Sequence, residues 1–381
     1  MKILMISPKS KTLVNFRGDL IKEMVSNGHE VITVGPEDAY EEQINELGAK
    51  FWLLKMEKNS TGIVHDIKYM MKLRKIMKEE TPDVVFSYTI KPVIYGTLAA
   101  KLAGVKNIYP MFTGLGYAFT SKTFKAKIVK LVALFLYRIS LPFATKVFFQ
   151  NKDDLNQFIE KRYINKEKGV LVNGSGVNMD KFAERPMPRD MSFLMIARIM
   201  KNKGVIEYLR AARIVKKKHP NINITLLGSI EDMQDSLTFE DIRPFIEDGS
   251  IEYFKETKDV RPYIENAAVF VLPSYREGTP RTVLESMAMG RPIITTNAPG
   301  CKETVIDGLN GLLVSVGDGK ELAEKMIWMI ENKREAKKMG QESLKMCKEK
   351  YDVKKVNRVM LETMKLKKKS TVNGSEISES I

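Results

Sequence analysis

Short apolar runs alternate with longer amphipathic segments along the first half of the chain. Segments with helical periodicity, such as 64–80 and 95–103, separate the runs. Apolar strands that alternate with helices are typical of a parallel sheet covered by helices on both faces. The pattern therefore predicts an open α/β unit with strands at 2–7, 30–35, 49–54, 83–88 and 106–112, and its first helix at about 18–27 after a loop.

The same rhythm starts again after a polar, proline-rich stretch at 184–188. Strands are predicted at 191–197, 222–228, 268–274, 292–296 and 311–315, with helices between them and a long helical stretch from 320 to 369. We therefore predict two α/β domains with a cleft between them, and ligands at the carboxyl ends of their strands. The predicted boundaries are 1–183 for the first domain, joined by a C-terminal helix at 352–369, then 184–351 for the second, and 370–381 for a disordered tail.

The segment after the predicted strand 268–274 carries two glutamates eight positions apart. Glu277 is expected at the strand end, 278–280 form a tight turn, and a helix is expected from Thr282. The N-terminus of such a helix presents unpaired N–H groups that suit phosphate, and Pro280 is tolerated at a helix start. Glu285, one turn into the helix, could accept paired hydroxyls, as on a ribose. Taken alone, the spacing favours an ordinary helix cap with two surface glutamates.

Two cations follow the predicted strand 191–197. Arg198 and Lys203 lie five positions apart, just before a helix that is predicted to begin near Gly204. Cations at a strand end can neutralise a diphosphate leaving group. This spacing means little in a chain with net charge +15, but it places a second candidate phosphate contact in the same domain as Glu277 and Glu285.

Together these motifs resemble family 4 of the retaining glycosyltransferases, with the GT-B architecture of two facing Rossmann-like domains. The resemblance covers nearly the whole chain and is strongest from 194 to 311. It implies a donor-binding domain at 184–351 and a membrane-facing acceptor domain at 1–183, with Glu277, Arg198 and Lys203 as catalytic residues. The donor-binding residues that it implies are Arg198, Lys203, Gly228, Asp259, Val260, Glu277, Gly278, Thr279, Pro280, Arg281, Thr282 and Glu285.

Within the family, the sequence is similar to enzymes that act on polyprenyl-diphosphate-linked sugars in capsule, exopolysaccharide and protein-glycan assembly. We therefore expect a UDP-sugar donor carrying a hexose or N-acetylhexosamine, and an undecaprenyl-diphosphate-linked acceptor. Where many relatives carry a histidine near the reaction centre this chain has none, because its three histidines are at 29, 65 and 219. The acceptor or phosphate contacts expected are Asn15, Phe16, Arg17 and Gly18 in a loop, Lys91 at a strand end, and Thr113, Gly114, Leu115 and Gly116.

Charge and amphipathicity point to a membrane surface. No Asp or Glu occurs between Asp83 and Asp153, where ten Lys or Arg occur. In the segment 122–146, Ile128, Leu131, Val132, Phe135, Leu136 and Ile139 share one face of a predicted helix, and Lys127, Lys130 and Arg138 lie on the other. The membrane contacts expected are Lys125, Lys127, Lys130, Leu131, Phe135 and Arg138. The alternative is that the apolar face packs on the sheet.

Other features exclude some classes and leave others open. No signal peptide or membrane-spanning run is apparent and the two cysteines lack a disulfide or zinc pattern, so we expect a cytoplasmic protein at the inner face of the membrane. No D-x-D pair follows a strand, and we expect no cofactor and no metal. An NAD-binding glycine motif and a nucleic-acid-binding motif are both absent. A nucleotide-sugar epimerase of the same fold and a degenerate nucleotide-sugar-binding protein remain alternatives.

Overall fold

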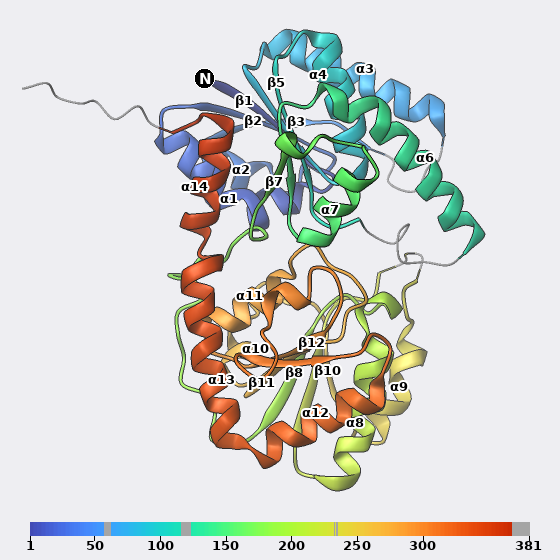
Figure 1. Cartoon of the computed structure of the whole chain (residues 1–381), viewed down its shortest axis with the longest axis vertical. Coiled ribbons are helices and arrows are strands. Elements are labelled where there is room, and N and C mark those ends of the chain that lie inside the picture. The colour runs from blue at the N-terminus through green and yellow to red at the C-terminus, as the bar shows by residue number, and fades with distance from the viewer. Residues whose placement is uncertain (57–61, 116–122, 232, 234, 368–381) are drawn as a thin grey trace, which may run out of the picture.

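The chain folds into two α/β domains stacked along the long axis of the molecule (Figure 1). The computed structural model describes residues 1–56, 62–115, 123–231, 233 and 235–367, with Ile63 and Lys125 described only as parts of their helices. Each domain contains one sheet, and every strand pair in both sheets is parallel. The predicted fold class is therefore confirmed.

The N-terminal domain contains a seven-stranded sheet in the order β3-β2-β1-β4-β5-β6-β7. Apolar strand residues are buried on both faces, which explains why these strands lack polar alternation. The strands are β1 (Lys2–Ile6), β2 (Glu30–Gly35), β3 (Ala49–Leu53), β4 (Val84–Tyr88), β5 (Asn107–Phe112), β6 (Val147–Phe149) and β7 (Gly169–Leu171). Its helices are α1 (Ser10–Ser26), α2 (Glu41–Glu46), α3 (Ile63–Glu80), α4 (Thr97–Ala103), α6 (Phe124–Ser140) and α7 (Lys152–Glu160).

The C-terminal domain contains a six-stranded sheet in the order β10-β9-β8-β11-β12-β13. The strands are β8 (Ser192–Ile196), β9 (Asn223–Leu227), β10 (Glu252–Phe254), β11 (Val269–Leu272), β12 (Ile293–Thr296) and β13 (Gly311–Val314). The helices are α8 (Val205–Lys218), α9 (Phe239–Glu247), α10 (Arg261–Glu265), α11 (Arg281–Ala288), α12 (Gly319–Glu331) and α13 (Lys333–Met346). One apolar core fills this domain from Val177 to Tyr351.

The last helix, α14 (Val353–Met364), returns to the N-terminal domain. Its buried residues Val356, Met360 and Leu361 belong to the same core as residues of β1, β2 and α1. The chain therefore passes between the domains twice, and the two passages lie side by side. The Val177 amide donates to the Tyr351 carbonyl at 2.8 Å, and the Val353 amide donates to the Val177 carbonyl at 3.0 Å.

The predicted start of the first helix is wrong. Helix α1 begins at Ser10, so residues 15–18 lie inside a helix and not in a loop. The Ser10 amide donates to the Glu37 carboxylate at 2.7 Å, so a residue beyond β2 stabilises this helix start. The helical stretch predicted from 320 to 369 consists of α12, α13 and α14, with breaks at Asn332 and Asp352, and the C-terminal helix predicted at 352–369 is α14, which ends at Met364. The predicted tail at 370–381 lies outside the described residues.

Candidate active site

Most of the predicted donor-binding residues follow the carboxyl ends of neighbouring parallel strands. Arg198 follows β8, Gly228 follows β9, Asp259 follows β10 and Glu277 follows β11. Because these strands are parallel neighbours, the four positions meet at one edge of the C-terminal sheet. This edge faces the N-terminal domain, as the interdomain contacts below show.

Glu277 lies in the segment between β11 and α11, residues 273–280, which we call the donor loop. It is therefore not at a strand end as predicted, because β11 stops at Leu272. The Glu277 carboxylate accepts hydrogen bonds from the Lys203 ammonium at 2.5 Å and the Ser274 hydroxyl at 2.8 Å. The side chain is only 15% exposed, so it is not a surface glutamate. Lys203 and Glu277, 74 positions apart in sequence, therefore form one site.

Arg198 lies beside a second carboxylate at the same edge. Its guanidinium is 3.8 Å from Glu231, and the Lys9 ammonium of the N-terminal domain is 3.6 Å from the same carboxylate. Lys11 similarly pairs with Glu256 across the domains. The sequence did not predict Lys9, Lys11, Glu231 or Glu256 as site residues. A contact between residues more than 200 positions apart leaves no local pattern in the sequence. Cations from both domains therefore meet carboxylates at this edge of the C-terminal sheet.

Glu285 is buried beneath the start of α11 and pairs with Arg281 at 3.0 Å. Burial raises the pKa of its carboxyl above the usual range, and the Arg281 guanidinium offsets only part of this effect. The Thr282 hydroxyl donates to the Ile196 carbonyl at 3.3 Å and so attaches α11 to β8. Pro280 directly precedes the first residue of α11, where the missing N–H has no cost.

Gly228 and Asp259 play different structural parts at this edge of the sheet. A Cβ atom on Gly228 would lie 1.8 Å from the Ala197 carbonyl oxygen, so only glycine fits between the segments after β8 and β9. Asp259 accepts hydrogen bonds from Arg261, which lower the pKa of its carboxyl to about 2. Val260 directly precedes α10. All three stand at the edge of the sheet that carries Glu277.

Arg17 is buried within the N-terminal domain and does not lie in a loop as predicted. Because α1 is helical at this position, the Arg17 guanidinium is buried over the rings of Phe86 and Tyr88, at 5.8 and 5.1 Å from their centroids. Burial lowers the pKa of Arg17 to about 10. Its neighbour Phe16 does reach the other domain, with its ring 5.4 Å from the Arg281 guanidinium. Asn15 is exposed and Gly18 is buried.

The remaining acceptor-side predictions separate into polar, packing and interface residues. Lys91 pairs with Asp66 of α3 at 2.8 Å. Leu115 is fully buried in the core beneath α6, so its side chain is a packing residue. Gly114 adopts φ +104° and contacts the backbone of Gly278, which places the segment after β5 against the donor loop. Thr113 lies at the same contact, and Gly116 lies outside the described residues.

Helix α6 presents its apolar side outward. Ala133 and Tyr137 pack inward against the core, whereas six large apolar side chains are between 42% and 80% exposed: Phe124, Ile128, Leu131, Val132, Phe135 and Ile139. We call these six the α6 stripe. The alternative in which this face packs on the sheet is therefore wrong, although Leu136, expected on the same face, is half-buried.

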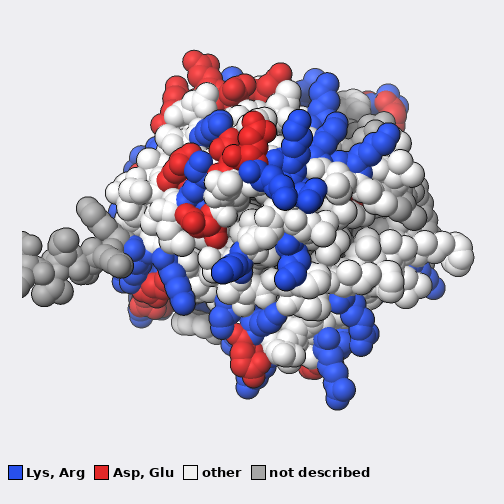
Figure 2. Space-filling model, turned by 90° about the horizontal axis from the view of Figure 1, so that it is seen from above, with Lys and Arg blue, Asp and Glu red and all other residues white. Residues whose placement is uncertain are grey.

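Cations border the uncharged surface of this domain. Viewed from the N-terminal domain, Figure 2 shows a broad uncharged area with Lys and Arg side chains around it. Lys127 and Arg138 of α6 are exposed, Lys130 is half-buried, and the side chain of Lys125 lies outside the described residues. Helix α3 adds the exposed Lys68, Lys72 and Lys75, together with the exposed Val64, Ile67 and Met71. None of the helices in the described ranges is both long and apolar enough to span a bilayer.

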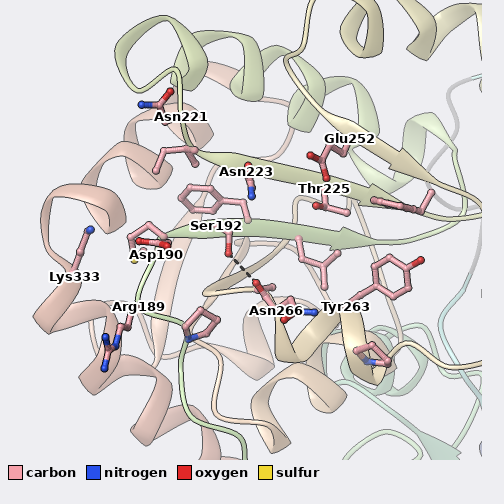
Figure 3. A pocket seen from close by; sticks show the side chains of 18 residues that line it. Arg189, Asp190, Ser192, Asn221, Asn223, Thr225, Glu252, Tyr263, Asn266 and Lys333 are labelled. Carbon is pink, nitrogen blue, oxygen red and sulfur yellow. Dashed lines mark hydrogen bonds between the residues drawn. The ribbon is translucent and has the colours of Figure 1, made fainter.

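A separate hollow of about 940 Å³ lies on the C-terminal domain, mainly at the amino ends of its strands (Figure 3). Ser192, Asn223 and Glu252 line it from the first residues of β8, β9 and β10. Residues that follow these strands at their carboxyl ends, such as Arg198 and Gly228, are not part of its lining. This hollow is therefore distinct from the site around Glu277.

Comparisons with known proteins agree with this geometry. The family model for glycosyl transferases group 1 matches residues 178–346, and the model for glycosyl transferase 4-like proteins matches residues 2–151. Together they cover both domains and the whole edge that carries the site. The chain therefore belongs to the glycosyltransferases of family 4, which have the GT-B architecture.

Similar curated proteins act on lipid-linked sugars. An N,N'-diacetylbacillosaminyl-diphospho-undecaprenol alpha-1,3-N-acetylgalactosaminyltransferase from Campylobacter jejuni is 28% identical, over 88% of this chain and 90% of its own length. A UDP-Gal:alpha-D-GlcNAc-diphosphoundecaprenol alpha-1,3-galactosyltransferase from Escherichia coli is 26% identical, over 71% of this chain and 72% of its own length. Among solved structures, Anabaena HepE with UDP-glucose has a TM-score of 0.78 at 16% identity, covering 96% of this chain and 99% of that chain.

Proposed function

We propose that this glycosyltransferase transfers a hexose or N-acetylhexosamine from a UDP-sugar to an undecaprenyl-diphosphate-linked sugar at the inner face of the cell membrane. The observation that carries the lipid-linked acceptor is the outward-facing α6 stripe with its bordering cations. Such a surface suits the interfacial region of an anionic bilayer. The two relatives named above support the same acceptor class, since each name includes an undecaprenol-diphosphate sugar.

The proposed chemistry follows from the charges at the sheet edge. Arg198, Lys203 and the N-terminus of α11 stabilise the negative charge that develops on the leaving diphosphate. Glu277 contacts the donor sugar, and Glu285 accepts the hydroxyls of the ribose. The acceptor hydroxyl attacks the anomeric carbon on the face that the diphosphate leaves and gives its proton to the departing diphosphate, so the configuration is retained. These residues supply the charge without a metal, so activity is expected to survive chelation of divalent cations.

The test is a nucleotide-release assay with purified protein, UDP-sugars and synthetic polyprenyl-diphosphate-linked acceptors, with and without EDTA. We expect acceptor-dependent UDP release in EDTA, and loss of at least about two orders of magnitude in rate for Glu277→Gln and Arg198→Ala. The matched control is Glu240→Gln on the surface of α9, which should keep the wild-type rate. Product stereochemistry is read from the anomeric coupling constant by NMR.

The same assay separates the alternatives. Interconversion of the UDP-sugar without acceptor would indicate an epimerase. Nucleotide-sugar binding with neither transfer nor interconversion would indicate a degenerate binding protein. Release that EDTA abolishes and Mg²⁺ restores would contradict metal-independent transfer while leaving the transferase assignment in place.

A further inference from the structure

The donor loop is held from outside its own domain. The Asn151 side-chain amide, at the start of α7, donates to the carbonyls of Glu277 at 3.2 Å and Gly278 at 3.4 Å. The Thr279 hydroxyl donates to the Gln150 carbonyl at 2.9 Å. The backbone that carries Glu277 is therefore bonded to the N-terminal domain, while its carboxylate is bonded to Lys203 and Ser274 of the C-terminal domain.

A buried ion pair adds to these hydrogen bonds. Arg276, next to Glu277, pairs with Asp154 of α7, whose side chain is 1% exposed. Asp154 is itself fixed, because its amide donates to the Asn151 side-chain oxygen at 2.7 Å and its carboxylate accepts from the Asn151 side-chain amide at 3.0 Å. Buried charge pairs depend strongly on geometry, because separation leaves each charge without water or a partner. A small displacement of α7 from the donor loop would therefore break the whole set.

The backbone segments at this contact pack so closely that a side chain would not fit at three of the glycines. A Cβ atom on Gly278 would lie 2.4 Å from the Thr113 carbonyl oxygen, and one on Gly114 would lie 2.8 Å from the Gly278 nitrogen. On the far side of the loop, a Cβ atom on Gly300 would lie 2.1 Å from the Glu277 carbonyl oxygen. The donor loop is thus packed between the two domains, and its conformation depends on their separation.

From these contacts we infer that Asn151 and Asp154 are positioning residues that hold the backbone of Glu277 when the two domains are in contact. The start of α7 holds the donor loop. When Asp154 pairs with Arg276 and Asn151 bonds to the donor-loop carbonyls, the backbone that carries the Glu277 carboxylate is fixed at the sheet edge. When the domains separate, the loop loses these bonds, and Glu277 keeps only its contacts within the C-terminal domain, among them those with Lys203 and Ser274. The catalytic consequence rests on the proposed transferase function, whereas the mechanical coupling does not.

The experiment compares Asp154→Asn, Arg276→Gln and the double variant with wild type in the full chain. Hydrogen exchange of the donor-loop amides reports the coupling, and kcat, the KM for the donor and the Kd for UDP report its consequence. The double variant removes both charges and so avoids a lone buried charge that could unfold the protein. The control is Asp248→Asn, which breaks the exposed Arg213–Asp248 pair within the C-terminal domain.

Each single variant is expected to speed donor-loop exchange by about tenfold or more and to lower kcat by about tenfold or more, with the Kd for UDP within about twofold. The double variant should be no slower than the slower single variant, because the two residues act as one unit. Wild-type exchange and kcat in Asp154→Asn would overturn the inference, as would a loss of UDP affinity in proportion to kcat. An inactive wild type would contradict the proposed function. The hydrogen-exchange data would still test whether the start of α7 holds the donor loop.

Discussion

Replacing two residues of the α6 stripe tests whether this surface enters a membrane. Leu131 and Phe135 are 67% and 65% exposed, and they lie one helical turn apart. Fully burying a Leu or Phe side chain contributes about 1.5–3 kcal/mol, so transferring the exposed two thirds of each contributes about 1–2 kcal/mol. The double variant Leu131→Ser, Phe135→Ser should therefore lose about 2–4 kcal/mol of binding free energy. At about 1.4 kcal/mol per factor of ten, its partitioning should fall by about thirty- to seven-hundredfold.

The assay is sedimentation with sucrose-loaded vesicles containing anionic lipid. A matched control is Ile214→Ser, Phe239→Ser, which removes an exposed aliphatic and an exposed phenyl side chain from α8 and α9 of the other domain. Binding by the α6 variant within about twofold of wild type would refute the reasoning. Equal losses in the variant and the control would refute it too, because the effect would then not be specific to α6. The melting temperature of the α6 variant should change little, since about two thirds of each of its two side chains is exposed.

Three further predictions concern the interior of the protein. Gly278→Ala should destabilise the domain contact by about 1–3 kcal/mol, because its Cβ meets the Thr113 carbonyl oxygen at 2.4 Å; an unchanged melting curve and an unchanged rate would contradict this. The raised pKa of Glu285 means that the folded state disfavours the ionised form of this carboxyl. As pH rises from about 4.5 through the folded-state pKa, the wild type should therefore lose stability relative to Glu285→Gln. The same difference in melting temperature at every pH would contradict this. Burial raises the pKa of both Cys301 and Cys347 to about 12, so neither should react quickly with Ellman's reagent at pH 8 before the protein is unfolded, and rapid native labelling would show that these sites open.

The sequence was sufficient to predict the fold because its signals are local. Strands such as 191–197 and 222–228 are apolar runs of the right length, and the turns between elements carry glycine. The edge of the C-terminal sheet could also be predicted, because parallel strands bring their carboxyl ends together. The sequence therefore predicts Arg198 and Glu277 in the same domain, each after a predicted strand.

The parts that could not be predicted depend on distant contacts. Glu37 stabilises the start of α1, so the helix extends over Asn15, Phe16 and Arg17, which local propensity had placed in a loop. The Asp154–Arg276 pair joins residues 122 positions apart. For α6, periodicity predicted an apolar face, but only the packing of Ala133 and Tyr137 shows that this face points away from the core.

The two connections between the domains lie side by side, and this gives a rotation of one domain against the other a single pivot. The segment after β7 and the residues just before α14 are bonded side by side at Val177, so a rotation between the domains would bend both connections at one place. A rotation at such a pivot moves atoms in proportion to their distance from it. A small angular change there is therefore magnified in the parts of the two domains that are farthest from Val177. A chain joined by one flexible tether would have no fixed pivot, and twisting and sliding would compete with opening.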